Sequence, residues 1–315
     1  MKPEAPSAAV ELLEAGPFTT IQDSGRFGYR RFGVPVSGAL DASSLSLANR
    51  RVGNRPEAAA LEVFHGPTAM TALESCLVSH AGSAVRAFVD GDVVKENPLR
   101  VQSGSTLKLE SRGDSTIFYV AFAGGIRADE VMGSMSTYVR AKFGGRGGRV
   151  LREGDQIFVF PPSSEGASTR VDAMSETPKA HRVVLGPHAE LFPTESLQSF
   201  FKAEYRVSFS SDRMGYRLEG LALRGFRDWG RVLTLPVFPG MVQITPDGLP
   251  IVLMADCQTT GGYPVIAMVL GPDLCALAQK SPGSSVSFQE VSDGQASGIL
   301  ESFGRTTGFS LRPKE

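Results

Sequence analysis

Residues 84–94 read AVRAFVDGDVV, two short apolar runs joined by Asp90-Gly91-Asp92. Asp-Gly between apolar runs is typical of a two-residue β-hairpin turn, so the pattern predicts two antiparallel strands. Similar short runs rich in Val, Ile and Phe, bounded by Gly, Pro, Asp or Ser, recur along the chain. They predict further strands at residues 106–110, 116–122, 156–160, 182–185, 205–209, 251–254, 265–269 and 286–291. Regular alternation of strands and helices is absent, which favours barrels or sandwiches over a doubly wound sheet.

Helical signals are few. The best is residues 41–53, where Asp41 can cap the first turn and Leu45, Ala48 and Val52 recur on one face. Further short helices are predicted at residues 194–201, 273–281 and 128–132. We therefore expect a mainly β chain with a few short helices.

Composition narrows the function classes. The 315 residues include 35 Gly and carry a formal net charge of -1, which argues against a bulk nucleic-acid binder. No apolar run approaches the ~18 residues that a membrane-spanning helix needs. The first residues include acids and lack an apolar stretch, and the three Cys form no C-x-x-C pair. We expect a cytoplasmic protein with no nucleic-acid or membrane partner.

A polar stretch divides the chain. Residues 161–180, PPSSEGASTRVDAMSETPKA, hold Pro, Ser, Thr and Gly without an apolar period. We predict an N-terminal subdomain at 1–165, a linker at 166–180 and a C-terminal subdomain at 181–315. A short echo crosses this boundary, because SGRFGYR at 24–30 and SDRMGYR at 211–217 share five of seven residues. The echo indicates either two related barrels or a chance match.

The first candidate site is DCQTTGGYP at residues 256–264, which follows an apolar strand. Asp256 can act as a base or ligand anchor, and Gln258 and Thr260 can hydrogen-bond an amide or a carboxylate. The alternative is a turn stabilised by its own Asp side chain. Cys257 is interpreted as a small buried thiol. Gln243 lies just before the turn Pro246-Asp247-Gly248 and is a further candidate.

Two other segments can bind anions. YVRAKFGGRGGR at residues 138–149 holds four cations and four Gly, so it can form an anion nest, or it is a solvated loop. It lacks the spacing of a Walker A loop. Arg213 can bind a carboxylate or phosphate, or pair locally with Asp212. The four His show no metal-binding spacing, and no metal site is expected.

Motifs in order along nearly the whole chain carry a resemblance. They are TTIQDSGR (19–26), GVPVSGALD (33–41), ANR (48–50), VGN (52–54), AGGI (123–126), STY (136–138), FGG (143–145), residues 211–220, PGMVQ (239–243), PDG (246–248) and residues 254–264. With these motifs the chain resembles the allophanate hydrolase subunit 2 family, also called the biotin-dependent carboxyltransferase family. That family includes the C subunit of the ATP-dependent 5-oxoprolinase and the Kip inhibitor antagonist.

The resemblance implies two cyclophilin-like β-barrel subdomains and a partner chain of the subunit 1 family, with the working cleft formed between the two. Residues on matched segments are the expected site. Asp256 and Gln258 are expected to be catalytic. Expected to bind the substrate or an anion are Tyr138, Arg140, Arg213, Gln243, Thr260, Gly261 and Tyr263.

The leading functional hypothesis is that the chain is one component of a multi-chain enzyme. The sequence carries no A-M-K-M biotinylation site, which favours a subunit of an ATP-dependent 5-oxoprolinase that converts 5-oxoproline to glutamate. This reading implies ATP in the complex, a subunit 1-type partner like the B subunit of 5-oxoprolinase, and a third partner like its A subunit. One alternative is a regulatory protein that antagonises a Kip-type kinase inhibitor. Another is the carboxyltransferase component of a biotin-dependent urea carboxylase or allophanate system.

Overall fold

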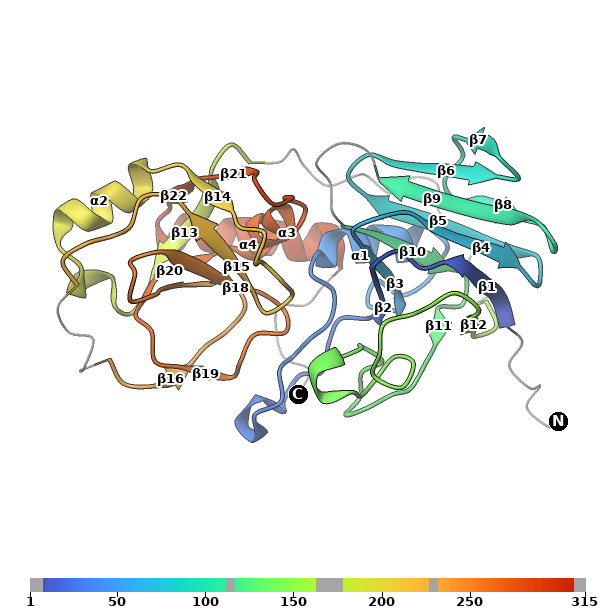
Figure 1. The fold of residues 1–315 in the computed structure, drawn as a ribbon, viewed down its shortest axis with the longest axis horizontal. Coiled ribbons are helices and arrows are strands. Elements are labelled where there is room, and N and C mark those ends of the chain that lie inside the picture. Colours follow the sequence, from blue (N-terminus) through green and yellow to red (C-terminus); the bar gives the residue numbers. More distant parts are fainter. Residues whose placement is uncertain (1–7, 112–116, 163–177, 227–231, 309–315) are drawn as a thin grey trace. The chain divides into compact units, whose positions relative to one another are not determined.

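The structure, a computed structural model, describes residues 8–111, 117–162, 178–226 and 232–308 (Figure 1). The chain forms two compact units: unit 1 comprises Met1–Arg26, Ser37–Met174 and Thr307–Phe309, and unit 2 comprises Phe27–Val36, Ser175–Thr306 and Ser310–Glu315. A short segment from the first half of the sequence, Phe27–Val36, therefore belongs to unit 2. The predicted linker at 166–180 lies mostly outside the described residues.

Unit 1 contains two sheets. The first has seven strands in the order β11-β12-β1-β4-β9-β6-β7. These are β1 (Ala8–Glu14), β4 (Thr68–Ala72), β6 (Val85–Val89), β7 (Asp92–Val94), β9 (Thr106–Ser111), β11 (Ile126–Arg127) and β12 (Gln156–Val159). The second has five strands in the order β2-β3-β10-β5-β8. These are β2 (Phe18–Gln22), β3 (Ala60–Phe64), β5 (Cys76–Gly82), β8 (Leu99–Val101) and β10 (Ile117–Phe122).

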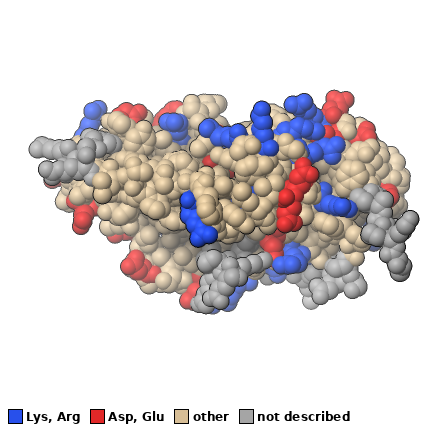
Figure 2. Space-filling model, turned by 90° about the horizontal axis from the view of Figure 1, so that it is seen from below, with Lys and Arg blue, Asp and Glu red and all other residues tan. Residues whose placement is uncertain are grey.

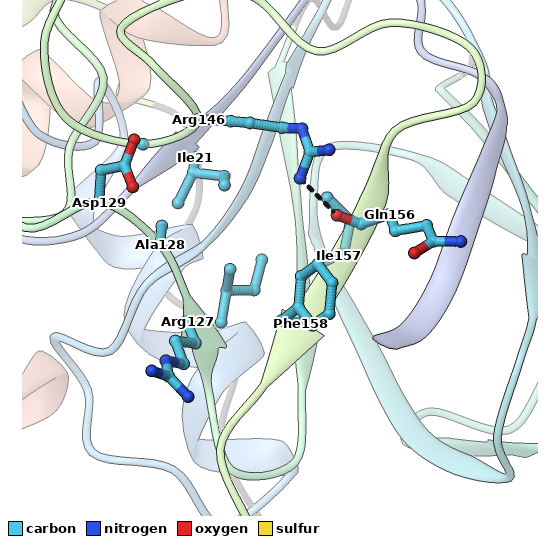
Figure 3. Close-up of a pocket in the computed structure, with 10 residues that line it drawn as sticks. Ile21, Arg127, Ala128, Asp129, Arg146, Gln156, Ile157 and Phe158 are labelled. Carbon is cyan, nitrogen blue, oxygen red and sulfur yellow. Dashed lines mark hydrogen bonds between the residues drawn. The ribbon is translucent and has the colours of Figure 1, made fainter. Parts of the chain in front are cut away.

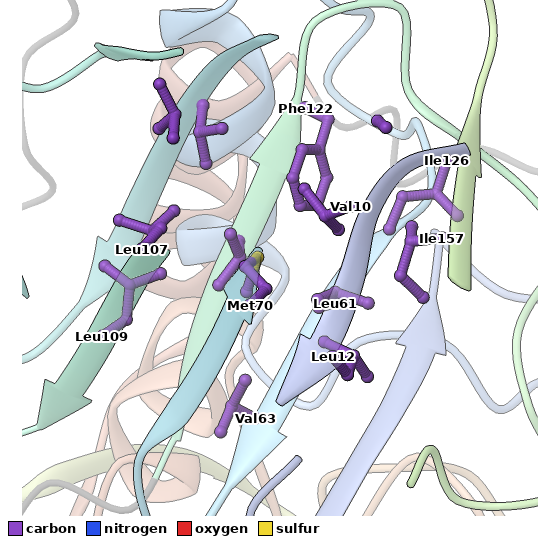
Figure 4. Close-up of a cluster of buried hydrophobic side chains, with 14 of the residues drawn as sticks. Val10, Leu12, Leu61, Val63, Met70, Leu107, Leu109, Phe122, Ile126 and Ile157 are labelled. Atoms are coloured by element: carbon purple, nitrogen blue, oxygen red, sulfur yellow. The ribbon is translucent and has the colours of Figure 1, made fainter. Parts of the chain in front are cut away.

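The core of unit 1 is one apolar cluster contributed by both sheets (Figure 4). In β9, Leu107 and Leu109 are buried while their neighbours are more exposed, as alternation along a strand requires. Every residue of β10 is buried, because it lies between β3 and β5 in its sheet and helix α1 (Ala42–Arg51) packs against it. Each fully buried Leu or Val side chain contributes roughly 1.5–3 kcal/mol to folding.

The hairpin predicted at residues 84–94 is confirmed. Strands β6 and β7 pair antiparallel, and Val89 lies opposite Asp92. The two residues between them, Asp90 and Gly91, have φ of 51° and 92°. Positive φ at both central residues is the geometry that matches the twist of a two-residue hairpin, which explains Gly at the second position.

Unit 2 contains an eight-stranded sheet in the order β21-β14-β15-β18-β17-β20-β13-β22 and a two-stranded sheet, β16-β19. The strands are β13 (His181–Leu185), β14 (Tyr205–Val207), β15 (Gly215–Glu219), β16 (Leu235–Pro236), β17 (Met241–Ile244), β18 (Pro250–Leu253), β19 (Thr260–Gly261), β20 (Val265–Val269), β21 (Ser285–Val286) and β22 (Phe288–Glu290). In the large sheet, β13 and β22 pair parallel. The predicted mainly β fold class with a few helices is confirmed.

The helices partly match the predictions. Helix α1 has the predicted cap, because the Asp41 carboxylate accepts the Ser44 N–H at 3.0 Å. Helices α2 (Thr194–Lys202) and α3 (Gly271–Ala278) lie where helices are predicted, although α3 begins two residues earlier. Helix α4 (Asp293–Thr307) is not predicted by the sequence, since its Gly residues weaken the helical signal. One-turn 3-10 helices are η1 (Arg30–Phe32), η2 (Val139–Ala141) and η3 (Ala189–Leu191).

The predicted helix at residues 128–132 is wrong. Asp129 and Val131 form backbone bridges to Gly145 and Ser134 instead. Met132 and Gly133 both have positive φ, so this segment turns tightly. The echo between residues 24–30 and 211–217 also has no common secondary structure, because the first leads into η1 and the second into β15.

Acidic and basic side chains are interspersed on the face drawn in Figure 2, in keeping with the net charge of -1. Among the helices of the described residues, none is long and apolar enough to span a membrane.

Candidate functional site

Seven of the nine predicted site residues gather in unit 2. Gln243 lies on β17, and the chain leaves the neighbouring strand β18 just before Asp256. The segment that follows, residues 256–263, carries Gln258, Thr260, Gly261 and Tyr263. Arg213 lies in the turn before β15, which pairs with β18. Sheet pairing thus brings together residues that are far apart in the sequence.

The buried part of this site is an ion pair. Arg213 Nε donates to Asp256 Oδ2 at 2.9 Å, and Nη2 donates to Oδ1 at 3.2 Å. The side chains are only 6% and 9% exposed. The backbone N–H of Asp256 also donates to the Arg213 carbonyl at 2.9 Å. The carboxylate and guanidinium therefore neutralise each other below the surface, and they tie the start of the 256–263 segment to the β15 turn.

Gln243 connects this buried layer to the surface. Its side chain is buried, its Oε1 accepts from Gln258 Nε2 at 3.4 Å, and its Nε2 donates to the Tyr263 carbonyl at 3.4 Å. Gln258 itself is exposed, as are Thr260 and Tyr263. The exposed amide and hydroxyl are thus available to a ligand, and the buried Gln243 amide holds Gln258 and the Tyr263 backbone in place.

Gly261 is required by this packing. A Cβ at Gly261 would lie 2.6 Å from Gln243 Nε2 and 3.2 Å from Val237 Cγ1. Thr260 and Gly261 form the short strand β19, which pairs with β16. A side chain at Gly261 would therefore displace the Gln243 amide.

Arg30 is a site residue that the sequence analysis did not single out. Its Nη2 donates to the carbonyls of Val237, Gln258 (3.2 Å) and Thr259 (3.5 Å), and its guanidinium lies 4.9 Å from the centre of the Phe238 ring. Arg30 lies on the Phe27–Val36 segment, which unit 2 takes from the first half of the sequence. The only sequence signal was its place in the echo at residues 24–30.

Cys257 is fully buried, as interpreted from the sequence. Burial raises the pKa of its thiol to about 11, although the nearby Arg30 guanidinium acts in the opposite direction. The thiol therefore stays protonated at neutral pH and is a poor nucleophile.

Tyr138 and Arg140 lie in unit 1, on the glycine-rich segment 138–149. Tyr138 pairs with Phe143 through the backbone, their ring centres are 5.5 Å apart, and η2 lies between them. Arg140 is exposed. The other two arginines of this segment, Arg146 and Arg149, bind Asp155 instead of leaving an open nest, with Nε–Oδ1 at 2.9 Å and Nη1–Oδ2 at 2.7 Å.

Within the described residues, no group of three or more His, Cys, Asp or Glu side chains is placed to hold a metal ion. The groups gathered at the unit 2 site can hydrogen-bond a ligand through amide, hydroxyl and backbone atoms, beside the buried Arg213–Asp256 ion pair.

One protein family model covers most of this mainly β chain, including every strand that carries the unit 2 site. The family described as "Carboxyltransferase domain, subdomain A and B" matches residues 32–290. The chain belongs to this family, and the resemblance drawn from its motifs is confirmed.

Curated relatives include 5-oxoprolinase subunits and urea amidolyases. The C subunit of the Escherichia coli 5-oxoprolinase is 35% identical over 286 residues, which cover 90% of this chain and 91% of that protein. The urea amidolyase of Saccharomyces cerevisiae is 32% identical over 322 residues, which cover 93% of this chain but 17% of that protein. The crystal structure of the K. lactis urea amidolyase superimposes with a TM-score of 0.88 at 27% identity, covering 97% of this chain and 20% of that one. The chain thus spans about a fifth of the length of the urea amidolyases.

Proposed function

We propose that this chain is a subunit of an ATP-dependent 5-oxoprolinase, which opens the cyclic amide of 5-oxoproline to give glutamate. One observation carries the proposal: the similarity to the C subunit of a 5-oxoprolinase covers about nine-tenths of both chains. The urea amidolyases match over a small part of their length. Such a complex would act in the cytoplasm, with a subunit 1-type partner like the B subunit of 5-oxoprolinase and a third partner like its A subunit.

The unit 2 site is the proposed substrate site. A lactam offers one N–H donor and one carbonyl acceptor, and a primary amide such as that of Gln258 can satisfy both. Thr260 adds a hydroxyl, and Tyr263 a partly exposed ring. Because both oxygens of Asp256 accept from Arg213, we propose that this pair positions the 256–263 segment. We also propose that Tyr138 and Arg140 of unit 1 bind an anion.

The glycine-rich segment 138–149 has the composition best suited to phosphate binding in this chain, but its contacts do not fit ATP. Binding a triphosphate needs several unpaired donors around a backbone nest. In segment 138–149, Arg149 gives both Nη groups and Arg146 gives Nε to the Asp155 carboxylate, so too few donors remain for three phosphates. We therefore propose that a partner chain of the complex binds ATP, and we assign no step at this site to it.

The test is reconstitution. The chain is coexpressed with its two proposed partners, 5-oxoproline and ATP are added, and glutamate is followed. Glutamate that forms only when all chains and ATP are present is expected. Controls omit one chain or ATP in turn. A well-assembled complex that forms no glutamate would overturn the proposal.

A second candidate is biotin-dependent carboxyl transfer, which the name of the matching family and the urea amidolyase relatives favour. In that case a biotinylated carrier from another protein would deliver the carboxyl group. A biotin blot of the proteins that copurify with the chain tests it. A biotinylated partner, together with urea-dependent fixation of labelled bicarbonate, would support this candidate over the first.

A further inference from the structure

Unit 1 contains a pocket that the proposed function does not use. Its volume is about 180 Å³. Its lining residues come from strands β2, β11 and β12 and the glycine-rich segment (Figure 3), and they are Ile21, Ile126, Arg127, Ala128, Asp129, Gly145, Arg146, Gln156, Ile157 and Phe158. A pocket of this size takes a small metabolite rather than a nucleotide.

The floor of the pocket is apolar. Ile21, Ile126 and Ile157 are each at most 3% exposed, and Figure 3 shows Ile21, Ile157 and Phe158 around its centre. A branched aliphatic group of a ligand would be removed from water against these side chains.

Two opposite charges flank this floor. Figure 3 shows Asp129 on one side of Ile21 and the Arg146 guanidinium on the other, while Arg127 points away. The backbones of Asp129 and Gly145 are joined by two hydrogen bonds, of 2.7 and 3.1 Å. The two charged side chains are therefore held by neighbouring, bonded segments.

Each charged group is fixed by hydrogen bonds and keeps one polar atom without a hydrogen-bond partner in the described part of the chain. Asp129 Oδ2 accepts the Gly147 N–H at 2.9 Å, and Oδ1 has no hydrogen-bond partner in the described part of the chain. Arg146 donates from Nε to Asp155 at 2.9 Å and from Nη1 to the Gln156 carbonyl at 3.0 Å. Arg146 Nη2 has no hydrogen-bond partner in the part of the chain that the structure describes. Both groups are thus oriented in advance of binding.

We propose that this pocket binds a small zwitterion of the α-amino acid class with an aliphatic side chain. The ligand ammonium donates to Asp129 Oδ1, the ligand carboxylate accepts from Arg146 Nη2, and the side chain lies on the isoleucine floor. The site lies within unit 1, and the assignment is independent of the proposed 5-oxoprolinase activity.

The experiment uses the full chain labelled with ¹³C at the isoleucine methyl groups. L-valine is titrated in, and saturable shifts are expected at Ile21, Ile126 and Ile157. Ile244 and Ile266, buried in unit 2, should not move. Two matched probes each lack one charge: isovalerate has no amino group and isobutylamine has no carboxylate. Each should bind at least about tenfold more weakly than L-valine, because one charge-assisted hydrogen bond is lost.

Variants distinguish an effect on the pocket from an effect on the whole fold. Asp129→Asn and Arg146→Gln should each weaken L-valine binding at least about tenfold. Arg149→Gln is the matched control, because Arg149 binds the same Asp155 but does not line the pocket. Ala128→Leu should fill the pocket and abolish the shifts while the other methyl signals stay in place.

Three results would overturn the proposal. They are the absence of saturable shifts with L-valine, binding of isovalerate or isobutylamine as tight as that of L-valine, and an Arg149→Gln effect as large as that of Arg146→Gln.

Discussion

Arg213 and Asp256 form a buried pair whose two charges depend on each other. Their side chains are 6% and 9% exposed, so water cannot replace either partner. Removing one member of a buried pair leaves an uncompensated charge, which costs more than the pair itself contributes. The pair therefore anchors the 256–263 segment while both charges are present, and the buried site tolerates a neutral pair better than a single charge.

Asp256→Asn is expected to lower the free energy of unfolding by about 3–5 kcal/mol, because the Arg213 cation is left without its carboxylate. The double variant Asp256→Asn with Arg213→Gln should recover most of this loss. Urea unfolding measures the free energy of unfolding of the single and the double variant. A single variant as stable as the parent would contradict the prediction. Turnover by the double variant in the assembled complex would support the positioning role, and a folded but inactive double variant would show that the carboxylate itself is needed.

Gly261→Ala is expected to reduce turnover of the proposed 5-oxoprolinase complex by about tenfold or more, since the new Cβ displaces the Gln243 amide from its contacts. It should also lower the free energy of unfolding by about 1–3 kcal/mol, because the Cβ overpacks a buried site. Gly262→Ala is the matched control, because the nearest atom to its Cβ is Thr234 Oγ1 at 3.5 Å, an ordinary contact. Steady-state kinetics of the reconstituted complex measure the effect. Equal activities of the two variants would refute the assignment.

At the scale of elements, the segment Phe27–Val36 completes unit 2. It carries η1, and Arg30 at its start holds three carbonyls of the site loops. Strand β19 has two residues and pairs only with β16, also of two residues, within the described part of the chain. Such short strands have little stability of their own. The Arg30 contacts are therefore a main support of residues 256–260.

Arg30→Met is expected to increase amide hydrogen exchange in residues 256–260, because the carbonyls of Gln258 and Thr259 lose their donor. Arg31→Met is the control, since the exposed Arg31 stacks on the neighbouring Phe32 ring rather than on the site loops. Hydrogen exchange measured by mass spectrometry compares the amide protection of residues 256–260 in the two variants. Unchanged protection in Arg30→Met would show that the loop is held by other contacts.

At the scale of the whole molecule, each unit contains a histidine that stays neutral at physiological pH: His181 of unit 2 is buried and His80 of unit 1 is half-buried. Burial lowers the pKa of His80 in unit 1 and of His181 in unit 2 to about 4. The unfolded chain, with histidine pKa near 6.5, binds more protons between pH 6.5 and 4. Stability from these residues is therefore fully present above pH 6.5 and is lost as the pH falls.

The expected slope is about 1.4 kcal/mol per pH unit for each of the two histidines within that window. Urea unfolding between pH 7.5 and 4.5 measures it, and His80→Gln and His181→Gln should each make the curve less steep. A slope that neither substitution changes would assign acid sensitivity to other groups.

The sequence by itself determined the features that depend on residues close together in the chain. The hairpin of β6 and β7 follows from Asp90-Gly91 between apolar runs, and α1 follows from its Asp41 cap and apolar face. The polar residues of 256–263 were visible because they follow an apolar strand. Each of these signals is a local periodicity or a turn requirement, so a few consecutive residues contain it.

Only the tertiary structure decided which residues meet. Arg213 and Asp256 are 43 residues apart, and Arg30 reaches Gln258 across 228. Asp155 binds Arg146 and Arg149 of the glycine-rich segment, for which composition alone left an anion nest and a solvated loop open. Such contacts depend on strand order and register, which sum many weak interactions over the whole sheet. A local pattern in the sequence therefore reports the chemistry of each group but not its partner.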